Sequence, residues 1–572
     1  MGTNHTMTNI RGGSGLFAGN TPQPLALIVL LFWAALIVPA GSFSIPPLDR
    51  DESRFMQATV QMLETGDFIA IRFQEDERNK KPAGIYWLQA ASVSAFSDAE
   101  ARQPWAFRIP SMLAGVLSIL LLCALFSRLT GPAPAFWGAV LLAAAPTFAG
   151  EATIAKTDAA LTTCVIAAQG CLALIFRRYV EQEEVGWRVP VFFWVAIGVG
   201  ILIKGPIAPM ISFLTIAALG LWLLATGRNP FRFGLAHRPF TGLGILALIV
   251  GPWAIAIGLA TEGRFFTEAL GDDAFGKLNE VQENHDGSFL YYLKAVWIFF
   301  WPAALFIPLA VWHAIQRWRD PAVAFCLAWL VPSWILFEIA STKLTHYTLP
   351  LYPALAVLIA LSVLSLREVI PGPGERIMRG IGILTCAGAS LVVGAALVWL
   401  VISFDDHGLT AFHVALLGVL GIIAITAGAL MSLRRPAAAM AAASLAGAVL
   451  AWGLFEGILP RLEALHLTPR VSRLLDDLDL HPRLDGAPPV ALYGYNEPSL
   501  VFLLGTDTIH AEAEGMAAWI AAAPGHVAIV DEENQAAFLA ATQQTRLSVL
   551  ATLDGFNYSN NKASTLTVYI SE

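Results

Sequence analysis

Long runs of apolar residues recur along most of the chain. Runs that can cross roughly 30 Å of hydrocarbon as a helix, about 17 to 25 residues each, begin near these residues: Leu25, Phe107, Ala133, Ala159, Val189, Pro206, Thr241, Tyr291, Pro321, Tyr347, Ile381, Ala411 and Pro436. We therefore expect about 13 membrane-spanning helices. The break at Lys204-Gly205-Pro206 leaves that number open by one or two.

The two ends of the chain have other patterns. Residues 1–23 are rich in Gly, Thr and Asn, which predicts a disordered tail. Residues 461–572 alternate polar helix-like patches with short apolar strands at 490–493, 527–530 and 566–570. We expect an all-α polytopic membrane bundle over 24–460, with a long loop at 44–105, and a C-terminal soluble α/β domain over 461–572.

Charge in the short loops orients this bundle. Arginines recur on alternate loops, and by the positive-inside rule those loops face the cytoplasm: Arg177 and Arg178; Arg228, Arg232 and Arg238; Arg317 and Arg319; Arg367, Arg376 and Arg379; Arg434 and Arg435. The opposite loops and the C-terminal domain would then face the periplasm of a bacterial inner membrane, or its equivalent.

Composition agrees with a membrane protein. Hydrophobic residues make up 56% of the 572 residues and charged residues only 14%, against roughly 25% charged in soluble domains. The formal net charge of −8 argues against nucleic acid as a partner. The five cysteines lie in apolar runs without metal-ligand spacing, so they predict neither a disulfide framework nor a zinc site.

Candidate chemistry gathers on the loops assigned to the periplasmic side. Asp51 and Glu52 follow the first apolar run, and two adjacent carboxylates at a membrane boundary are costly unless they bind a partner. Arg54, Lys81 and Lys343 could hold a lipid phosphate, Arg as a two-pronged donor and Lys as a point charge. A neighbouring carboxylate could take a proton from a hydroxyl group or ligate a metal.

Each of these residues also has a simpler interpretation. Asp158 could cap the helix that begins at Ala159, and Lys81 could lie along the bilayer surface with its ammonium group in water. Lys343 and Tyr347 are residue types that anchor helices at the headgroup level. In loop 261–288, Asp272, Asp273 and His285 could form a metal corner, although no regular ligand spacing supports it.

Five motifs resemble the type-C glycosyltransferases, which use polyprenyl-phosphate sugars, and within them the bacterial aminoarabinose transferases acting on lipid A and the protein mannosyltransferases. The motifs are Asp51-Glu52-Ser53-Arg54-Phe55, Lys81-Pro82-Ala83-Gly84-Ile85-Tyr86-Trp87-Leu88-Gln89, Ala155-Lys156-Thr157-Asp158, Lys204-Gly205-Pro206, and Ser341-Thr342-Lys343-Leu344-Thr345-His346-Tyr347-Thr348-Leu349-Pro350. They occur in the family's order and on one predicted face.

The resemblance implies roles for individual residues. Asp51, in its pair with Glu52, would be the catalytic acidic residue, and Asp158 would line the same cavity. Lys81 and Tyr347 would bind the donor phosphate, and Lys277 would stand where relatives carry an arginine. The chain departs from the family at three places: relatives have Glu where it has Lys80 and Tyr where it has Phe55, and it lacks their Glu-His pair before the eighth span. The resemblance therefore leaves open whether this protein binds a divalent metal.

The resemblance also implies the reaction, with several alternatives. The donor would be a polyprenyl-phosphate sugar. The acceptor would be lipid A, a glycan or a protein, and the enzyme would be a monomer. A galacturonosyl or mannosyl transferase would use the same phosphate clamp. A polyprenyl-lipid flippase is the alternative of another class, favoured only by Lys204 and Glu338 within apolar runs. A third alternative is a structural or sensory protein whose tail binds glycan.

Overall fold

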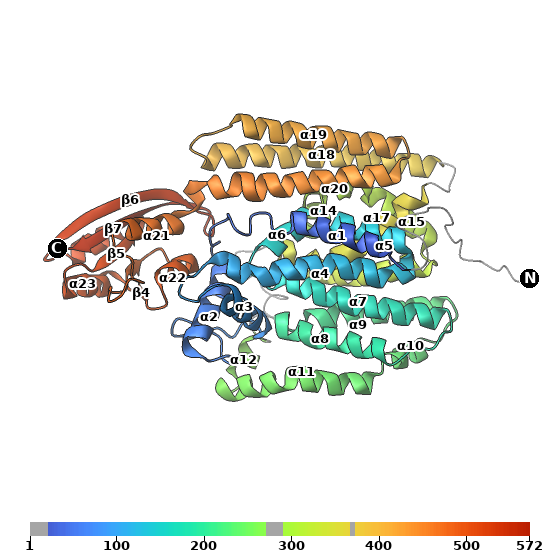
Figure 1. Ribbon diagram of the computed structural model, residues 1–572, viewed down its shortest axis with the longest axis horizontal. Helices are drawn as coiled ribbons and strands as arrows, with labels where there is room; N and C mark the ends of the chain where they lie inside the picture. Colours follow the sequence, from blue (N-terminus) through green and yellow to red (C-terminus); the bar gives the residue numbers. More distant parts are fainter. Residues whose placement is uncertain (1–20, 270, 272–289, 367–371) are drawn as a thin grey trace, which may run out of the picture.

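The computed structural model describes residues 21–269, 271, 290–366 and 372–572. Long helices run side by side along the longest axis of the molecule, and a domain built on a β-sheet sits at one end of the bundle (Figure 1). Helices α2 and α3 of loop 44–105 lie at that same end (Figure 1). The predicted architecture, an α-helical membrane bundle with a C-terminal domain that contains a sheet, is confirmed.

The apolar runs fold as helices of the bundle. Their bounds are α1 (Pro24–Ile37), α4 (Pro104–Thr130), α5 (Pro132–Ala143), α6 (Pro146–Thr153), α7 (Asp158–Val180), α8 (Arg188–Lys204), α9 (Ile207–Ala225), α10 (Pro230–Ala236), α11 (Pro239–Ala260), α12 (Arg264–Phe266), α14 (Tyr291–Phe299), α15 (Ile307–Arg317), α16 (Pro321–Ile339), α17 (Tyr352–Ser365), α18 (Pro373–Phe404), α19 (Ala411–Ser432) and α20 (Pro436–Trp452). A 3₁₀ segment, η3 (Thr345–Leu351), precedes α17.

Length and composition identify fewer than thirteen candidate spans among the described residues. Within the described residues, nine helices are long and apolar enough to cross a membrane, or up to eleven if two bent pairs each count as one span. The bent pairs are α5 with α6, at 64°, and α14 with the segment Ala303–Arg317, at 117°. Helices α1 and α8 have only 14 and 17 residues, so the exact number of thirteen is not confirmed.

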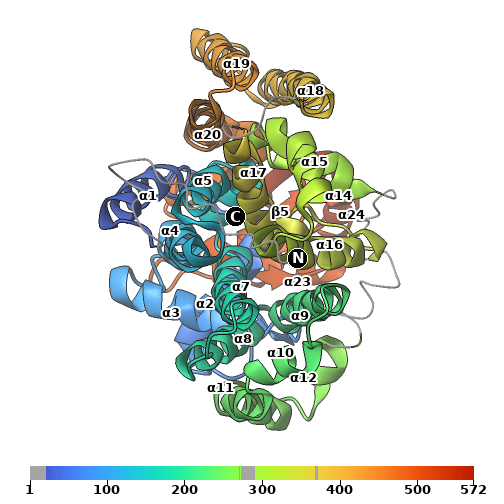
Figure 2. The ribbon, with the colours of Figure 1, turned by 90° about the vertical axis from the view of Figure 1, so that its right-hand side faces the viewer.

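Helix α7 lies near the centre of the bundle, while α18 and α19 form an outer layer (Figure 2). Helix α4 approaches α7 closely at Gly170, where α7 has no side chain: a Cβ atom at Gly170 would lie 2.5 Å from Leu125 of α4. The outer faces carry exposed apolar side chains such as Leu221 and Phe240, as a surface in contact with lipid requires.

Loop 44–105 folds into α2 (Asp51–Thr65), a short hairpin of β1 (Arg72–Phe73) and β2 (Asp76–Glu77), and α3 (Gly84–Phe96). Helix α2 ends at Gly66, which adopts the left-handed conformation (φ 70°) that terminates many helices. The apolar side of α2 is buried. Residues 44–105 are therefore a packed structure between the bundle and the C-terminal domain.

The C-terminal domain, residues 461–572, holds a five-stranded mixed sheet in the order β4-β3-β5-β7-β6. The strands are β3 (Ala491–Tyr493), β4 (Ile509–His510), β5 (Val527–Asp531), β6 (Leu547–Asn557) and β7 (Lys562–Ser571), with helices α21 (Leu467–Asp477), α22 (Pro498–Leu504), α23 (Ala513–Ala522) and α24 (Glu532–Ala541). β3 pairs in parallel with β4 and β5, and β7 pairs antiparallel with β5 and β6.

The C-terminal domain packs on loop 44–105. Phe502 of α22 lies edge-on to Phe107 of the bundle, with ring centroids 5.5 Å apart. The buried Arg102 donates to Gln57 at 2.6 Å and to the carbonyl of Phe502 at 2.8 Å. A buried cation with this many acceptors joins the two regions firmly.

Candidate functional site

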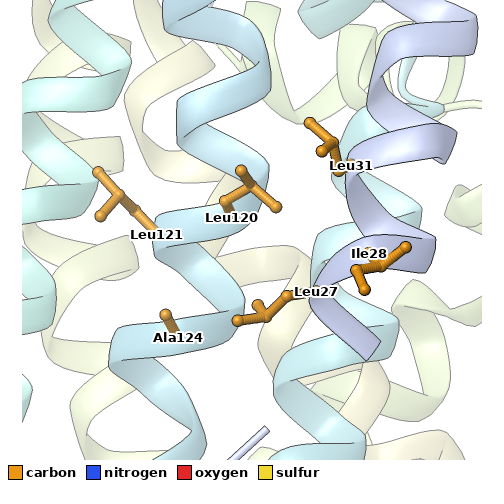
Figure 3. A pocket seen from close by; sticks show the side chains of 6 residues that line it. All are labelled: Leu27, Ile28, Leu31, Leu120, Leu121 and Ala124. Carbon is orange, nitrogen blue, oxygen red and sulfur yellow. The ribbon is translucent and has the colours of Figure 1, made fainter. Parts of the chain in front are cut away.

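Polar and charged side chains from four distant parts of the chain meet at the ends of helices. They are Asp51 at the start of α2, Glu151 at the end of α6, Lys156 between α6 and α7, Asp158 at the start of α7, Lys204 at the end of α8, and His346 and Tyr347 in η3. The apolar recess of about 250 Å³ between α1 and α4 lies elsewhere, and only aliphatic side chains line it (Figure 3). The polar cluster is therefore the candidate site.

Two ion pairs and a histidine connect the cluster. Lys204 Nζ lies 2.5 Å from Asp158 Oδ1, and Lys156 Nζ lies 3.5 Å from Glu151 Oε2. His346 stands between the two pairs, with Nδ1 3.5 Å from Glu151 Oε1 and Nε2 3.9 Å from Asp158 Oδ2. Carboxylates and cations thus alternate through one buried network, which offsets part of the cost of burying them.

Tyr347 belongs to the same network. The Lys204 ammonium group lies over its ring, 5.7 Å from the centroid, within reach of a cation–π interaction. The ring also lies edge-on to that of His346 at 5.1 Å. The structure therefore brings Tyr347 and Asp158, which the sequence predicts as parts of one site, to the same cation.

Asp51 is the first residue of α2 and is half-buried. Burial raises the pKa of its carboxyl group, but nearby positive charges, first that of Lys156 and then those of Arg78 and Arg54, outweigh burial and bring the pKa below its ordinary value. Conversely, burial lowers the pKa of Lys156, but the carboxylates around it raise the pKa above the ordinary value. Asp51 is thus a carboxylate beside an ammonium group at neutral pH.

Glu52 has different surroundings from Asp51. Its carboxylate accepts from Arg108 Nε at 2.8 Å and Nη2 at 2.9 Å, and from the backbone N–H groups of Ala155 at 2.8 Å and Leu48 at 3.0 Å. A carboxylate has about four acceptor positions, so these four bonds occupy it. The geometry gives Glu52 a structural task and offers no support for its predicted catalytic role.

Asp158 does not cap its helix. Helix α7 begins at Asp158 itself, and the preceding Thr157 accepts no side-chain capping bond. The Asp158 carboxylate instead faces Lys204 and accepts a bond from the Thr157 hydroxyl at 3.3 Å. The alternative that Asp158 is only a helix cap therefore fails.

The predicted phosphate-binding cations take different positions. Arg54 lies one turn after Asp51 in α2, and Lys81, which donates to the carbonyl of Lys80 at 3.1 Å, is half-buried just before α3. Lys343 is buried and donates to the carbonyls of Glu338 and Ala340, both at 2.7 Å. Its ammonium group is thus directed to the end of α16, which gives no support for phosphate binding and none for a headgroup anchor.

Four predicted residues, Lys277, Asp272, Asp273 and His285, lie outside the described residues. Within residues 21–269, 271, 290–366 and 372–572, no group of three or more His, Cys, Asp or Glu side chains is arranged to hold a metal ion.

Sequence reasoning missed Arg78. Its guanidinium group lies over the Phe55 ring, 5.6 Å from the centroid, and its charge acts on both Asp51 and Tyr86. Only the hairpin β1–β2 folds Arg78 back onto α2, with its backbone N–H donating to the carbonyl of Ile71 at 2.7 Å. The turn of this hairpin, Gln74-Glu75, contains no glycine or proline, so the sequence carries no signal for this approach.

Comparisons with known proteins agree on one group of enzymes. The family model "Dolichyl-phosphate-mannose-protein mannosyltransferase" matches residues 80–255. An "Undecaprenyl phosphate-alpha-4-amino-4-deoxy-L-arabinose arabinosyl transferase" of Pseudomonas paraeruginosa is 27% identical over 467 residues, covering 78% of this chain and 79% of the relative. A relative with the same name from Aeromonas salmonicida is 27% identical over 385 residues, covering 64% of this chain and 67% of the relative.

A solved structure shares the fold. The crystal structure of ArnT from Cupriavidus metallidurans bound to undecaprenyl phosphate superimposes with a TM-score of 0.70 at 19% identity, covering 96% of this chain and 98% of the other. A likeness over nearly the whole length includes both the bundle and the C-terminal domain.

Proposed function

We propose that this chain, which has the type-C glycosyltransferase fold and resembles the aminoarabinose and mannosyl transferases, is an integral-membrane glycosyltransferase. It moves 4-amino-4-deoxy-L-arabinose from an undecaprenyl phosphate donor to lipid A. The enzyme works as a monomer in the bacterial inner membrane, with its site and its C-terminal domain facing the periplasm.

One observation carries this proposal. The motifs around Asp51, Lys156–Asp158, Lys204 and His346–Tyr347 converge in a single charged cluster at the ends of apolar helices. A substrate with an anionic head and a long apolar tail matches such a place, because the tail stays in lipid while the head meets cations. The names of the relatives identify a substrate of that kind, a polyprenyl phosphate sugar.

The cations of the site stabilise the departing phosphate. In this proposal the cations Lys81, Lys277 and Arg54, together with the neutral Tyr347, hold the donor phosphate, and attack of the acceptor on the anomeric carbon from the opposite side inverts its configuration. Negative charge on the phosphate grows as the glycosidic bond breaks, and preorganised cations in a site with little water stabilise that charge. Loss of one such group slows turnover by about a hundredfold or more.

The role of Asp51 depends on the acceptor. A lipid A phosphate is already ionised, so it needs no general base, and the Asp51 carboxylate then orients the acceptor or balances the charge of Lys156. A hydroxyl acceptor needs a base to take its proton. The low pKa of Asp51 keeps the carboxylate ionised near neutral pH in both cases.

The sharpest test is Asp51→Asn in the full-length purified protein. We expect transfer of the sugar from undecaprenyl phosphate-α-4-amino-4-deoxy-L-arabinose to lipid A, measured by mass spectrometry, to fall by about a hundredfold or more. Binding of undecaprenyl phosphate should be retained, because the phosphate contacts are cations. Transfer at the wild-type rate by Asp51→Asn would refute the role of Asp51.

A second candidate, a mannosyl or galacturonosyl transferase to protein or lipopolysaccharide core, is favoured by the mannosyltransferase family model that matches residues 80–255. Supplying polyprenyl-phosphate mannose in the same assay decides between them. The transporter alternative loses its motivation, because Lys204 pairs with Asp158 and Glu338 accepts from the backbone of Leu293 at 2.8 Å.

A further inference from the structure

The C-terminal domain forms hydrogen bonds with Asp49 and Arg50, the two residues that precede Asp51. Tyr558 Oη accepts the backbone N–H of Asp49 at 2.5 Å, and Asn560 Oδ1 accepts from Arg50 Nη2 at 3.0 Å. The Ser499 hydroxyl donates to the Asp49 carboxylate. Ser499 comes from α22, and Tyr558 and Asn560 come from the turn between β6 and β7, so two separate parts of the domain reach the same dipeptide.

The backbone at Arg50 has an unusual conformation. Arg50 has φ 61° and ψ −108°, and no side-chain capping bond is made at this start of α2. Positive φ is unfavourable for a residue with a Cβ atom and persists where surrounding contacts impose it. Because Arg50 directly precedes Asp51, its conformation sets the direction in which α2 and the Asp51 side chain leave the turn.

The turn that carries Tyr558 and Asn560 is itself fixed. The Asn557 side-chain oxygen accepts the backbone N–H groups of Ser559 at 2.9 Å and Asn560 at 3.3 Å, and its Nδ2 donates to the buried Glu497 at 2.9 Å. In Figure 1 the β6–β7 hairpin extends from the C-terminal domain towards the bundle. The domain thus presents a rigid support, which is what positioning another residue requires.

The other side of the turn is anchored by the loop's own residues. The Ser53 hydroxyl donates to the carbonyl of Leu48 at 2.5 Å, and the Leu48 N–H donates to Glu52 at 3.0 Å. Helix α2 therefore holds residue 48, and the C-terminal domain holds residues 49 and 50. The position of Asp51 depends on both.

We infer that Tyr558 and Ser499 of the C-terminal domain are positioning residues for Asp51, so that this domain completes the transferase site without contacting the reacting atoms. The inference rests on the proposed function, because it assigns these residues to the reaction through Asp51.

The test compares Tyr558→Phe and Ser499→Ala with Gln74→Ala in the full-length protein. Gln74 Nε2 also bonds the C-terminal domain, at the carbonyls of Thr506 (3.1 Å) and Thr508 (2.6 Å), but it does not touch residues 49–51. We expect Tyr558→Phe to lower kcat at least tenfold, with KM for the donor and affinity for undecaprenyl phosphate changed less than twofold. Ser499→Ala should lower kcat in the same way, and Gln74→Ala should keep wild-type kcat.

A second step shows whether the effect passes through Asp51. In the Asp51→Asn background, Tyr558→Phe should cause no further loss of the residual rate, since the residue that it positions is already disabled. Equal losses of kcat in Tyr558→Phe and Gln74→Ala would overturn the inference. The contacts of Tyr558 and Ser499 with Asp49 would then only hold the C-terminal domain against loop 44–105. Wild-type kcat in both Tyr558→Phe and Ser499→Ala would also overturn the inference.

The outcomes separate this inference from the proposed function. An Asp51→Asn enzyme that transfers the sugar at the wild-type rate would remove the proposed role of Asp51 and the inference with it, whereas a wild-type protein that transfers no aminoarabinose to lipid A would remove the proposed function. An inactive Asp51→Asn enzyme together with fully active Tyr558→Phe and Ser499→Ala enzymes would remove the inference alone. Thermal unfolding in detergent shows that each variant is folded, and Ser499→Ala provides the result if Tyr558→Phe does not fold.

Discussion

At the scale of single residues, Asp51 and Glu52 are chain neighbours with opposite surroundings. Asp51 is half-buried among cations from several segments, whereas Glu52 is 2% exposed and closed in by Arg108 and two backbone groups. A carboxylate whose acceptor positions are all in use cannot also take a proton or hold a substrate. The surroundings of Glu52 therefore indicate a structural task, and those of Asp51 agree with the role proposed for it.

Glu52→Gln separates the two roles. The substitution leaves the Arg108 guanidinium buried without its counter-charge, and breaking a buried ion pair costs about 3 to 5 kcal/mol. We expect a clear fall in the thermal unfolding midpoint in detergent, while Asp51→Asn, the control, stays close to the wild type. A Glu52→Gln protein as stable as the wild type but inactive would instead restore the catalytic role that the sequence predicts.

Some of the site could be read from the sequence at this scale. The motifs around Asp51, Asp158 and Tyr347 lie in the cluster where the resemblance implied them. Arg78 could not be found, because its approach to Asp51 depends on the hairpin β1–β2. Glu52 and Lys343 are predicted as site residues from their residue type, their place at a membrane boundary and the motifs that contain them, and none of these reveals which backbone carbonyls or guanidinium groups a side chain meets after folding.

At the scale of elements, one glycine controls how α3 meets α8. A Cβ at Gly84 would lie 2.6 Å from the carbonyl oxygen of Leu202, so the two helices touch backbone to backbone. Gly84 follows Lys81 by one turn, and Leu202 precedes Lys204 by two residues. The contact therefore fixes the spacing between a predicted phosphate-binding cation and the cation that holds Asp158.

Gly84→Ala should disturb that spacing. Inserting a methyl group into a filled contact costs about 1 to 3 kcal/mol, and we expect both a lower unfolding midpoint and slower sugar transfer. Gly388→Ala in α18 is the matched control, because nothing lies within 4 Å of a Cβ there and alanine favours the helix. If both variants behave like the wild type, the close contact is not what sets the spacing.

Elements differ in how visible they are in the sequence. The strands β3, β5 and β7 contain the apolar runs that predict them, but β4 has only two residues and the edge strand β6 is partly exposed along its length. A strand at an edge buries less and needs no continuous apolar run. The pattern of hydrophobic residues therefore reveals the centre of this sheet and misses its edges.

At the scale of the whole molecule, the C-terminal domain and loop 44–105 share a buried acid. Burial and the charge of Glu497 raise the pKa of Asp49 to about 7, although hydrogen bonds from Ser499 and the charge of Arg50 act in the opposite direction. The groups that face Asp49 are Glu497 and Ser499 in the C-terminal domain, Tyr495 and Tyr558 near them, and Arg50 in its own loop. Packing of the C-terminal domain against loop 44–105 thus favours the protonated form of the Asp49 carboxyl group.

This raised pKa predicts the sign of a pH effect. The folded state holds the Asp49 proton up to about pH 7, whereas the unfolded chain loses it near pH 3.8, so the stabilising contribution is complete below about pH 4 and is lost as the pH rises through 7. We expect Asp49→Asn, which cannot ionise, to gain at least about 2 °C in unfolding midpoint relative to the wild type between pH 5 and pH 8. Parallel pH profiles for the two proteins would contradict the expectation.

The sequence by itself determined which segments are helices in a membrane, because apolar runs of sufficient length have no other stable state in lipid. It also determined the chemistry on offer, through the acids and cations of the five motifs. Only the tertiary structure decided which charges neutralise one another, since Glu52 meets Arg108 across 56 positions and Asp158 meets Lys204 across 46. Contacts at such separations depend on how the helices and the C-terminal domain pack, so the local pattern of hydrophobic and polar residues does not predict them.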